Sequence, residues 1–244
     1  MTELDNLRVV LVSTRNPLNI GAAARAMSNF GVTRLRVVNP YELAFREARS
    51  AVGASPILKH AEEFKSVADA IADCTLVVGT TAGQNRELQH PLRMLSEVSP
   101  EICHRLASGP VALLFGSEKR GLSNDDFSYC HWLLHIPTRD QHLSMNLGQA
   151  VAVCLYELAR DVETSKATEP LKAKAADLDR ITASLLESLK ISGYLKPRAG
   201  ASTEEKIRRL VRRLNMSDED AETFLGMLRK VNLALKRSRD DSNR

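Results

Sequence analysis

The chain has 244 residues, of which 43% are hydrophobic and 26% are charged, and its formal net charge at pH 7 is +4. This length can bury one substantial core and leaves room for a small second domain. No apolar run is long enough to cross a membrane, and residues 1–6 carry neither the basic region nor the apolar segment of a secretory signal. We therefore expect a soluble cytoplasmic protein.

The cysteines and histidines give no sign of a disulfide framework or a metal site. Four cysteines, at positions 74, 103, 130 and 154, stand singly in apolar surroundings and form no C-x-x-C pair. We expect them to be reduced core residues. The six histidines show no ligand spacing with these cysteines or with one another, so we expect no metal.

Strand-like and helical segments alternate along the first 160 residues. Apolar runs predict strands near 8–13, 34–38, 75–79, 110–115 and 132–136, and helical patterns fall near 20–30, 66–73, 123–130 and 145–160. This alternation is typical of an α/β fold with a parallel sheet and helices on both of its faces.

The composition changes over residues 159–176, which are rich in Glu, Thr, Ser and Lys and poor in large apolar residues. We predict a domain over 1–160, a linker over 161–176 and a small all-helical domain over 177–244. We expect three helices in this last domain. The first has an apolar stripe formed by Leu178, Ile181, Leu185 and Leu189. The second is capped at residues 202–205 and has Ile207, Leu210, Val211 and Leu214 on its apolar face, and the third begins at Ser217.

The second of these helices carries a run of arginines at Arg208, Arg209, Arg212 and Arg213. Such a run is often only a solvated face. Because the net charge of the whole chain is only mildly positive, a localised basic surface of this kind is needed to attract phosphates. Aromatic residues are scarce, so recognition of an RNA would depend on the shape of its backbone.

The segment between the first strand and the first helix is a candidate ligand loop. It reads Asn16-Pro-Leu-Asn-Ile-Gly-Ala-Ala-Ala-Arg25, and its helix start offers free backbone N–H groups to an anion or a polar ligand edge. Gly21 and the following alanines allow close packing, and Arg25 faces the same way as Gly21. Taken alone, this pattern more often marks a helix packed on its sheet with Arg25 in a surface ion pair.

A second, glycine-bracketed loop follows an apolar strand in Leu113-Leu-Phe-Gly-Ser-Glu-Lys-Arg-Gly-Leu122. Loops at the carboxyl ends of strands are where open α/β sheets hold ligands. The loop nearly matches the phosphate-binding pattern G-x-x-x-x-G-K-[ST], but Leu122 occupies the lysine position and Lys119 lies inside the loop. Binding of a nucleoside triphosphate is therefore a remote alternative.

The third segment joins Ile136-Pro137 at a strand end to Ser144-Met145-Asn146 at the start of an apolar helix. Together with Asn19-x-Gly21-x-x-x-Arg25 and Gly116-x-Glu118-x-x-Gly121-Leu122, it resembles the three motifs of the SpoU (TrmH) branch of the SPOUT RNA methyltransferases. The resemblance covers about residues 7–160. Met145 replaces the usual leucine, a change that nearly conserves volume.

This resemblance implies the SPOUT fold, in which the carboxyl-terminal part of the domain forms a trefoil knot, and the methyl donor S-adenosylmethionine held in a bent form. It also implies that three strand-end loops meet around one donor pocket. The residues expected to line that pocket are Thr80, Thr81, Ala82, Gly116, Gly121, Leu122, Ile136, Leu143, Ser144 and Met145.

The implied reaction is an in-line methyl transfer to a ribose 2′-hydroxyl. The resemblance assigns to Arg25 the contact with this hydroxyl and the adjacent phosphate, and often the role of base. A guanidinium in a protein stays protonated, so we expect Arg25 to hold the phosphate and to stabilise oxyanion charge. Four polar residues are expected nearby: Asn19, Glu118, Ser144 and Asn146. They could position Arg25 or relay the proton of the 2′-hydroxyl, and the alternative for each is a capping or turn role.

The expected partners are RNA and a second copy of the chain. The helical extension suggests tRNA as the substrate, at the cytidine or uridine in position 32 of the anticodon loop, and ribosomal RNA is the alternative. The residues expected to contact RNA are Arg25, Arg86, Arg208, Arg209, Arg212 and Arg213. For Arg86, a surface position without a role in RNA binding agrees with the sequence equally well. The resemblance implies a homodimer, the commonest oligomer. A non-catalytic RNA-binding protein is a more remote alternative.

Overall fold

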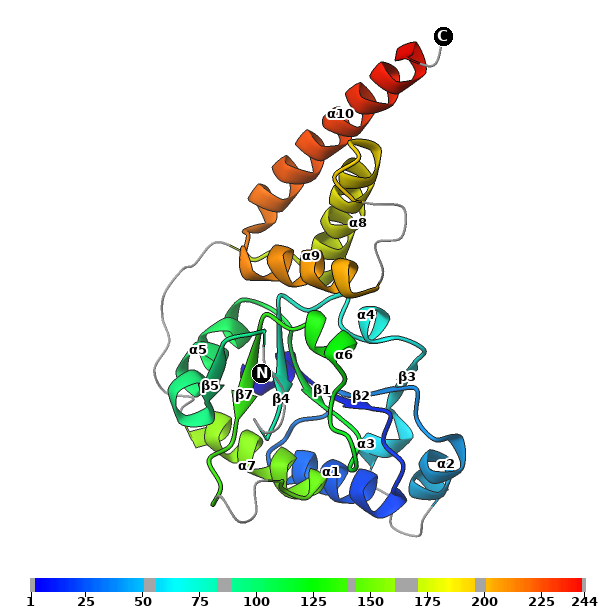
Figure 1. Cartoon of the computed structure of the whole chain (residues 1–244). Helices are drawn as coiled ribbons and strands as arrows, with labels where there is room; N and C mark the ends of the chain where they lie inside the picture. The colour runs from blue at the N-terminus through cyan, green and yellow to red at the C-terminus, as the bar shows by residue number, and fades with distance from the viewer. Residues whose placement is uncertain are drawn as a thin grey trace.

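The computed structural model describes residues 3–50, 56–82, 89–139, 144–160, 171–195 and 201–242. A seven-stranded sheet with the order β3-β2-β1-β6-β4-β7-β5 forms its centre, and every neighbouring pair is parallel (Figure 1). This confirms the predicted parallel sheet. The strands are β1 (Leu7–Val12), β2 (Leu35–Val38), β3 (Glu62–Phe64), β4 (Leu76–Thr80), β5 (Leu92–Met94), β6 (Val111–Phe115) and β7 (Trp132–His135).

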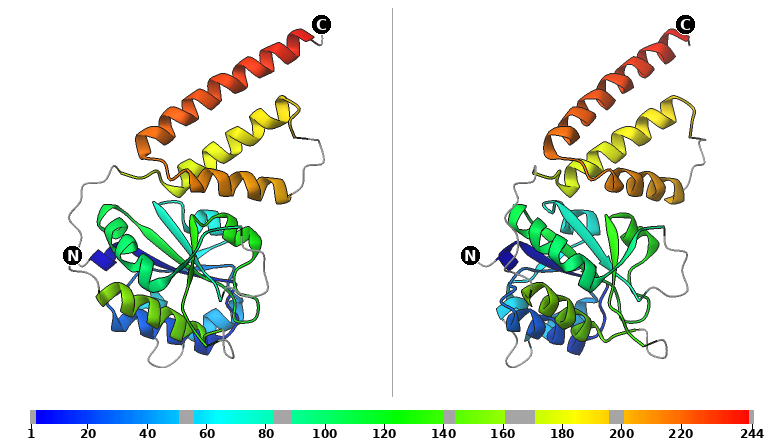
Figure 2. Two further views of the ribbon diagram at one scale, coloured as in Figure 1. Left: turned by 60° about the vertical axis from the view of Figure 1, so that its left-hand side comes forward. Right: turned by 90° about the vertical axis from the view of Figure 1, so that its left-hand side faces the viewer.

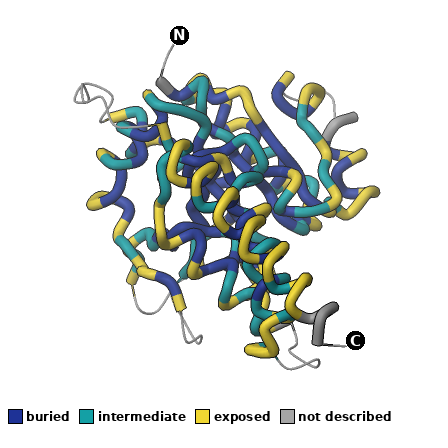
Figure 3. The backbone as a smooth tube through the Cα atoms, turned by 90° about the horizontal axis from the view of Figure 1, so that it is seen from above, coloured by how far each residue is buried: buried dark blue, intermediate teal, exposed yellow. Residues whose placement is uncertain are grey.

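Helices cover both faces of the sheet, as predicted. Along β1, Val9 and Leu11 join the core beneath α1, α5 and α7, whereas Val10 and Val12 join the core beneath α4 and α6. Because side chains alternate along a strand, both faces of β1 are apolar and buried. In Figure 3 the buried stretches of the backbone gather at the centre of this part of the chain. The helices of this part are η1 (Glu3–Asn6), α1 (Pro17–Asn29), α2 (Glu42–Ser50), α3 (Pro56–Lys59), α4 (Val67–Ala70), α5 (Leu95–Ser108), α6 (Asn124–Ser128) and α7 (Leu147–Arg160).

The carboxyl-terminal part has three helices, α8 (Ala175–Ile191), α9 (Ala201–Arg213) and α10 (Asp218–Ser242). In Figure 2, α8 and α10 project away from the sheet and α9 lies across their base. Ser217 caps α10 by accepting a hydrogen bond from Asp220 N at 3.1 Å, as predicted. The predicted cap at 202–205 was wrong, because α9 already begins at Ala201.

The helical part is attached at the amino ends of the central strands. Ala175 N donates to the carbonyl of Cys74 at 2.8 Å, just before β4, and the Arg105 guanidinium of α5 donates to Asn215 Oδ1 at 3.3 Å, between α9 and α10. Ala175 thus begins α8 inside the segment predicted to be a linker, and it packs in the core of the sheet domain. The carboxyl ends of the strands lie at the opposite edge of the sheet. The trefoil knot implied by the resemblance stays a prediction.

All four cysteines are free and buried, as predicted. Burial raises the pKa of the Cys154 thiol to about 12, so this thiol is protonated and unreactive at neutral pH. Among the described residues, no helix is long and apolar enough to cross a membrane.

His131 is a buried titratable group beneath the helical part. Its Nδ1 accepts a hydrogen bond from Val77 N at 3.1 Å, so this nitrogen carries no proton. Burial, together with the charges of Arg212 and Arg105, holds the pKa of His131 well below its usual value. Below a pH of about 6.5 the unfolded chain therefore binds more protons at this site than the folded chain does.

We expect this one group to lower the free energy of unfolding as the pH falls from about 6.5, by up to about 1.4 kcal/mol per pH unit. Urea denaturation of the native chain and of His131→Gln between pH 7 and pH 5 measures the effect. The stability advantage of the native chain over the variant should shrink toward pH 5. An advantage that stays constant with pH would contradict the prediction.

Candidate active site

Three loops meet at the carboxyl edge of the sheet and enclose a pocket of about 280 Å³. They follow β4, β6 and β7, so the strands place them side by side. All predicted donor-pocket residues that the structure describes line this pocket. The predicted pocket residue Leu143 and the predicted RNA contact Arg86 lie outside the described residues. Those present are Thr80, Thr81, Ala82, Gly116, Gly121, Leu122, Ile136, Ser144 and Met145.

The pocket also contains apolar residues that were not among the predicted site residues: Phe115, Phe127, Leu134, Leu147 and Ala150. Phe115 is the last residue of β6, and Leu134 lies next to the end of β7. Their position just before predicted ligand loops was the sequence signal that could have identified them. These residues give the pocket an apolar floor beneath polar loop groups, which is typical of small-molecule sites.

Loop 116–121 is closed tightly at its base. Gly121 N donates to the carbonyl of Ser117 at 2.8 Å, and Gly121 has a φ of +65°, a conformation that favours glycine. A Cβ on Gly116 would lie 2.0 Å from the backbone carbon of Gly121. Only glycine fits at position 116, because the two ends of the loop approach each other within backbone contact.

Glu118 joins this loop to the loop that precedes α1. Its carboxylate accepts hydrogen bonds from Arg15 N at 3.3 Å, Asn16 N at 3.1 Å and Asn19 Nδ2 at 3.2 Å. Partial burial alone would raise the pKa of Glu118, but these donors and the backbone N–H of Glu118 itself hold it below its usual value. A carboxylate with a lowered pKa and three donors is a weak base, so Glu118 organises the loops.

Asn19 and Asn146 continue this chain of hydrogen bonds. Asn146 Nδ2 donates to Asn19 Oδ1 at 2.9 Å, and Asn146 Oδ1 accepts from Gly148 N at 2.9 Å in the first turn of α7. Residues from all three motifs are thus linked in the order Glu118, Asn19, Asn146. This linkage orients α1 and α7, which pack so closely that a Cβ on Gly148 would lie 2.5 Å from the Cβ of Ala22.

Arg25 lies one turn beyond Gly21 on the outer face of α1. Its side chain is exposed, and it makes no ion pair with any residue that the structure describes. The close packing predicted at Gly21 is also absent: a Cβ there would meet nothing within 4 Å among the described residues. The close approach of α1 lies instead at Ala22. Arg25 is therefore available to a ligand.

The arginines of α9 do not form the exposed basic face that was predicted. Arg208 bonds Asp125, Ser128 and Glu204, and its guanidinium lies 4.1 Å from the centre of the Tyr129 ring. Arg212 has a side chain that is 0% exposed and pairs with Asp179 at 2.7 Å. Arg209 is also buried and lies 3.5 Å from Glu205, whereas Arg213 is exposed. Three of the four arginines thus hold the protein together, at the edge opposite the pocket.

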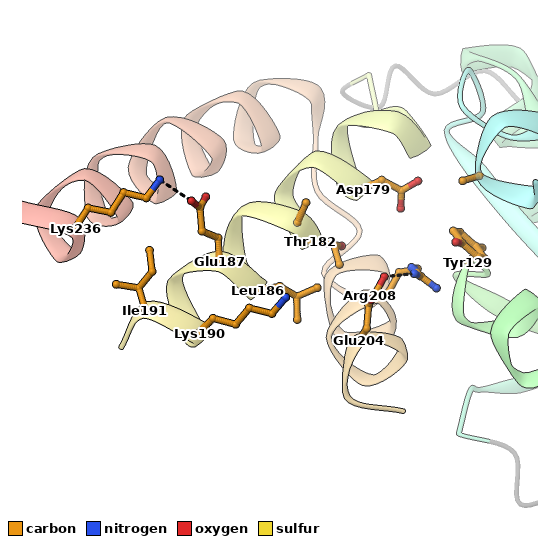
Figure 4. A pocket seen from close by; sticks show the side chains of 12 residues that line it. Tyr129, Asp179, Thr182, Leu186, Glu187, Lys190, Ile191, Glu204, Arg208 and Lys236 are labelled. Atoms are coloured by element: carbon orange, nitrogen blue, oxygen red, sulfur yellow. Dashed lines mark hydrogen bonds and ion pairs between the residues drawn. The ribbon is translucent and has the colours of Figure 1, made fainter. Parts of the chain in front are cut away.

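A second cavity, of about 1010 Å³, lies among α8, α9, α10 and the sheet domain (Figure 4). Ion pairs join its charged walls: Lys236 with Glu187 at 2.7 Å and Arg208 with Glu204 at 2.7 Å. Of the predicted site residues that the structure describes, only Arg208 lines it. Although this cavity is larger, the chemistry-bearing motif residues belong to the smaller pocket.

The parallel sheet and the pocket at its carboxyl edge define an α/β protein that holds a ligand between strand-end loops. The sequence model of the SpoU rRNA Methylase family matches residues 6–156, which is more than half of the chain, and the chain therefore belongs to this family. This confirms the resemblance that the three motifs predicted.

Two curated relatives are similar over nearly their whole length. The tRNA (cytidine/uridine-2′-O-)-methyltransferase TrmJ of Sodalis glossinidius is 34% identical over 235 residues, which cover 93% of this chain and 92% of that protein. TrmJ of Klebsiella pneumoniae is 34% identical over 237 residues, which cover 93% and 97%. The crystal structure of TrmJ from Z. mobilis ZM4 matches with a TM-score of 0.79 and 30% identity, and covers 92% of this chain and 98% of that chain.

Proposed function

We propose that this chain is an enzyme that transfers a methyl group from S-adenosylmethionine to a ribose 2′-hydroxyl of tRNA. One observation carries this function: the motif loops form a single pocket of about 280 Å³, and Glu118, Asn19 and Asn146 tie it to the helix that presents the exposed Arg25. Membership of the SpoU family and the similarity to TrmJ proteins support it. The target that we propose is the cytidine or uridine at position 32.

The donor, when bound among the pocket loops, supplies an electrophilic methyl group. The loops exclude water from one side and fix the direction of transfer, and alignment alone can supply much of the acceleration. Arg25 binds the phosphate next to the target ribose and stabilises the negative charge that develops on the 2′-oxygen as the proton of the 2′-hydroxyl passes to solvent water. It stays protonated, because a guanidinium is a very weak acid in proteins.

The test is to incubate the purified chain with radiolabelled S-adenosylmethionine and unmodified bulk tRNA, followed by nuclease digestion and mass spectrometry of the nucleosides. A 2′-O-methylated nucleoside from the anticodon loop is the expected product. Donor binding without transfer to tRNA would redirect the search to ribosomal RNA, the substrate in the name of the matching family. Absence of donor binding would overturn the enzyme function.

The rival nucleotide-binding function has weak support. Leu122 stands where the phosphate-binding lysine is required, and its side chain is only 1% exposed in the core. An apolar leucine side chain offers a phosphate neither a positive charge nor a hydrogen-bond donor.

Replacing Gly116 by alanine should disrupt the donor pocket. The added methyl group overlaps the backbone of Gly121, so loop 116–121 must move away from the pocket. We expect donor affinity, measured by calorimetry, to fall by about tenfold or more, equivalent to about 1.4 kcal/mol. Gly226→Ala is the matched control, because a Cβ at that position of α10 meets no atom of the described residues within 4 Å. Unchanged donor affinity in a folded Gly116→Ala protein would contradict the pocket assignment.

We also propose a cytoplasmic homodimer built on the outer face of α1 and α7. Leu18 in α1 is 80% exposed and Tyr156 in α7 is 56% exposed, and Ala22 beside Arg25 is exposed as well. A second copy that covers this face would bury these apolar groups and bring Arg25 to the edge of the interface. Sedimentation at micromolar concentration tests this arrangement, and a monomeric mass would refute it.

A further inference from the structure

The tip of loop 116–121 is a rigid, positively charged projection at the mouth of the pocket. Gly121 N bonds the carbonyl of Ser117, which closes the base, so the intervening residues form a short turn. Lys119 and Arg120 are exposed on this turn, and both line the pocket. The turn therefore presents two cations next to the space where the proposed reaction takes place.

Hydrogen bonds fix the direction in which this tip points. Glu118, the third residue of loop 116–121, is held by the backbone N–H groups of Arg15 and Asn16 and by the side chain of Asn19. Its negative charge is thus satisfied by neutral donors of the neighbouring loop. The same bonds place the exposed Arg15 beside the tip. A preorganised group binds with a smaller entropy cost than a mobile one.

We propose that Lys119 and Arg120 bind backbone phosphates of the RNA strand on either side of the ribose that is methylated. This inference rests on the proposed function and adds the residues that hold the substrate. The burial of Arg208, Arg209 and Arg212 removes three of the cations that the sequence had offered for RNA binding. Cations exposed to solvent at the pocket mouth are placed to contact a long polyanion, which neutralises several of them at once.

A competing ligand for the same cations is the single carboxylate of the donor. The two ligands differ in how binding depends on salt. Each phosphate contact to single-stranded nucleic acid contributes about 0.7 to the slope of log affinity against log salt concentration, whereas the donor carries no chain of phosphates.

The test compares Lys119→Gln, Arg120→Gln and the double variant with Arg34→Gln. Arg34 is an exposed cation just before the amino end of β2, at the opposite edge of the sheet, so it controls for the loss of one positive charge. For each protein we would measure the affinity for tRNA by fluorescence anisotropy from 50 to 300 mM KCl, the affinity for S-adenosylmethionine by calorimetry, and the melting temperature.

Each single variant should lower the tRNA affinity about three- to fivefold at 150 mM salt and reduce the salt slope by about 0.7, with unchanged donor affinity and melting temperature. The double variant should lose about twice that slope, and Arg34→Gln should match the native chain. Unchanged salt slopes would overturn the inference, as would a loss of donor affinity without a change in tRNA binding, which would assign the cations to the donor carboxylate. Failure of the native chain to bind the donor would instead overturn the proposed function.

Discussion

Replacing Arg25 by alanine is expected to lower the rate of methyl transfer strongly and to leave donor binding intact. Arg25 is exposed on α1 and is not among the residues that line the pocket, so its removal takes no contact away from the donor. It does take away the cation that stabilises charge on the 2′-oxygen. Loss of one such group typically costs 10²–10³ in rate, or about 3–4 kcal/mol of transition-state stabilisation.

Single-turnover transfer to tRNA measures this rate, and calorimetry measures the donor affinity. Arg25→Lys keeps the charge but loses the planar fork, so we expect it to recover only part of the activity. Arg46→Ala is the control, since Arg46 is another exposed arginine, on α2, paired with Glu42. A donor affinity that falls in Arg25→Ala, or a transfer rate that stays native, would contradict the role given to Arg25.

The central strands and the site loops could be predicted because their signals are local. Strands buried on both faces are continuous apolar runs, such as Val111–Phe115, and parallel strands bring their carboxyl ends to one edge. The edge strands β3 and β5 were missed, since each has only three residues and includes charged ones. They form by pairing with β2 and β7 rather than by propensity. Helix α5 was also missed, because Pro100 interrupts its helical sequence pattern.

The sequence also identified which polar residues belong to the site, but not what they do. Glu118 and Asn19 are separated by 99 residues, and Asn19 and Asn146 by 127. Their hydrogen bonds depend on the way the three loops meet, and no spacing along the chain encodes that. The motif positions were therefore predicted, whereas the role of Glu118 in joining two loops follows only from its contacts.

Helix α9 shows how tertiary partners can reverse a local pattern. Its apolar residues Leu210 and Leu214 were expected inside, yet they are 44% and 51% exposed, whereas Arg212 is 1% exposed. The reason is that Asp125 and Asp179, which lie 83 and 33 residues earlier than their arginine partners, sit against this helix. Carboxylates supplied by distant elements decide which face is buried, and the amphipathic pattern of one helix does not reveal them.

The pair formed by Arg212 and Asp179 gives the second large expected effect. Arg212 donates to Asp179 at 2.7 Å and to the carbonyl of Ala175 at 3.1 Å, and so joins α9 to α8. Burial raises the pKa of Asp179 and lowers the pKa of Arg212, although each partner's charge opposes the shift. In both groups the effect of burial on the pKa exceeds the opposing effect of the partner's charge.

Arg212→Ala should destabilise the helical part by about 3 kcal/mol, because it leaves the partly buried Asp179 carboxylate without its partner. The apolar double variant Arg212→Met with Asp179→Leu should recover most of that loss, since it removes both charges and keeps the volume. Urea denaturation followed by circular dichroism reports on the helices, and the fluorescence of Trp132, the single tryptophan, reports on β7 in the sheet domain. A single variant that costs less than about 1 kcal/mol, or a double variant as unstable as the single one, would contradict the cost assigned to leaving the Asp179 carboxylate unpaired.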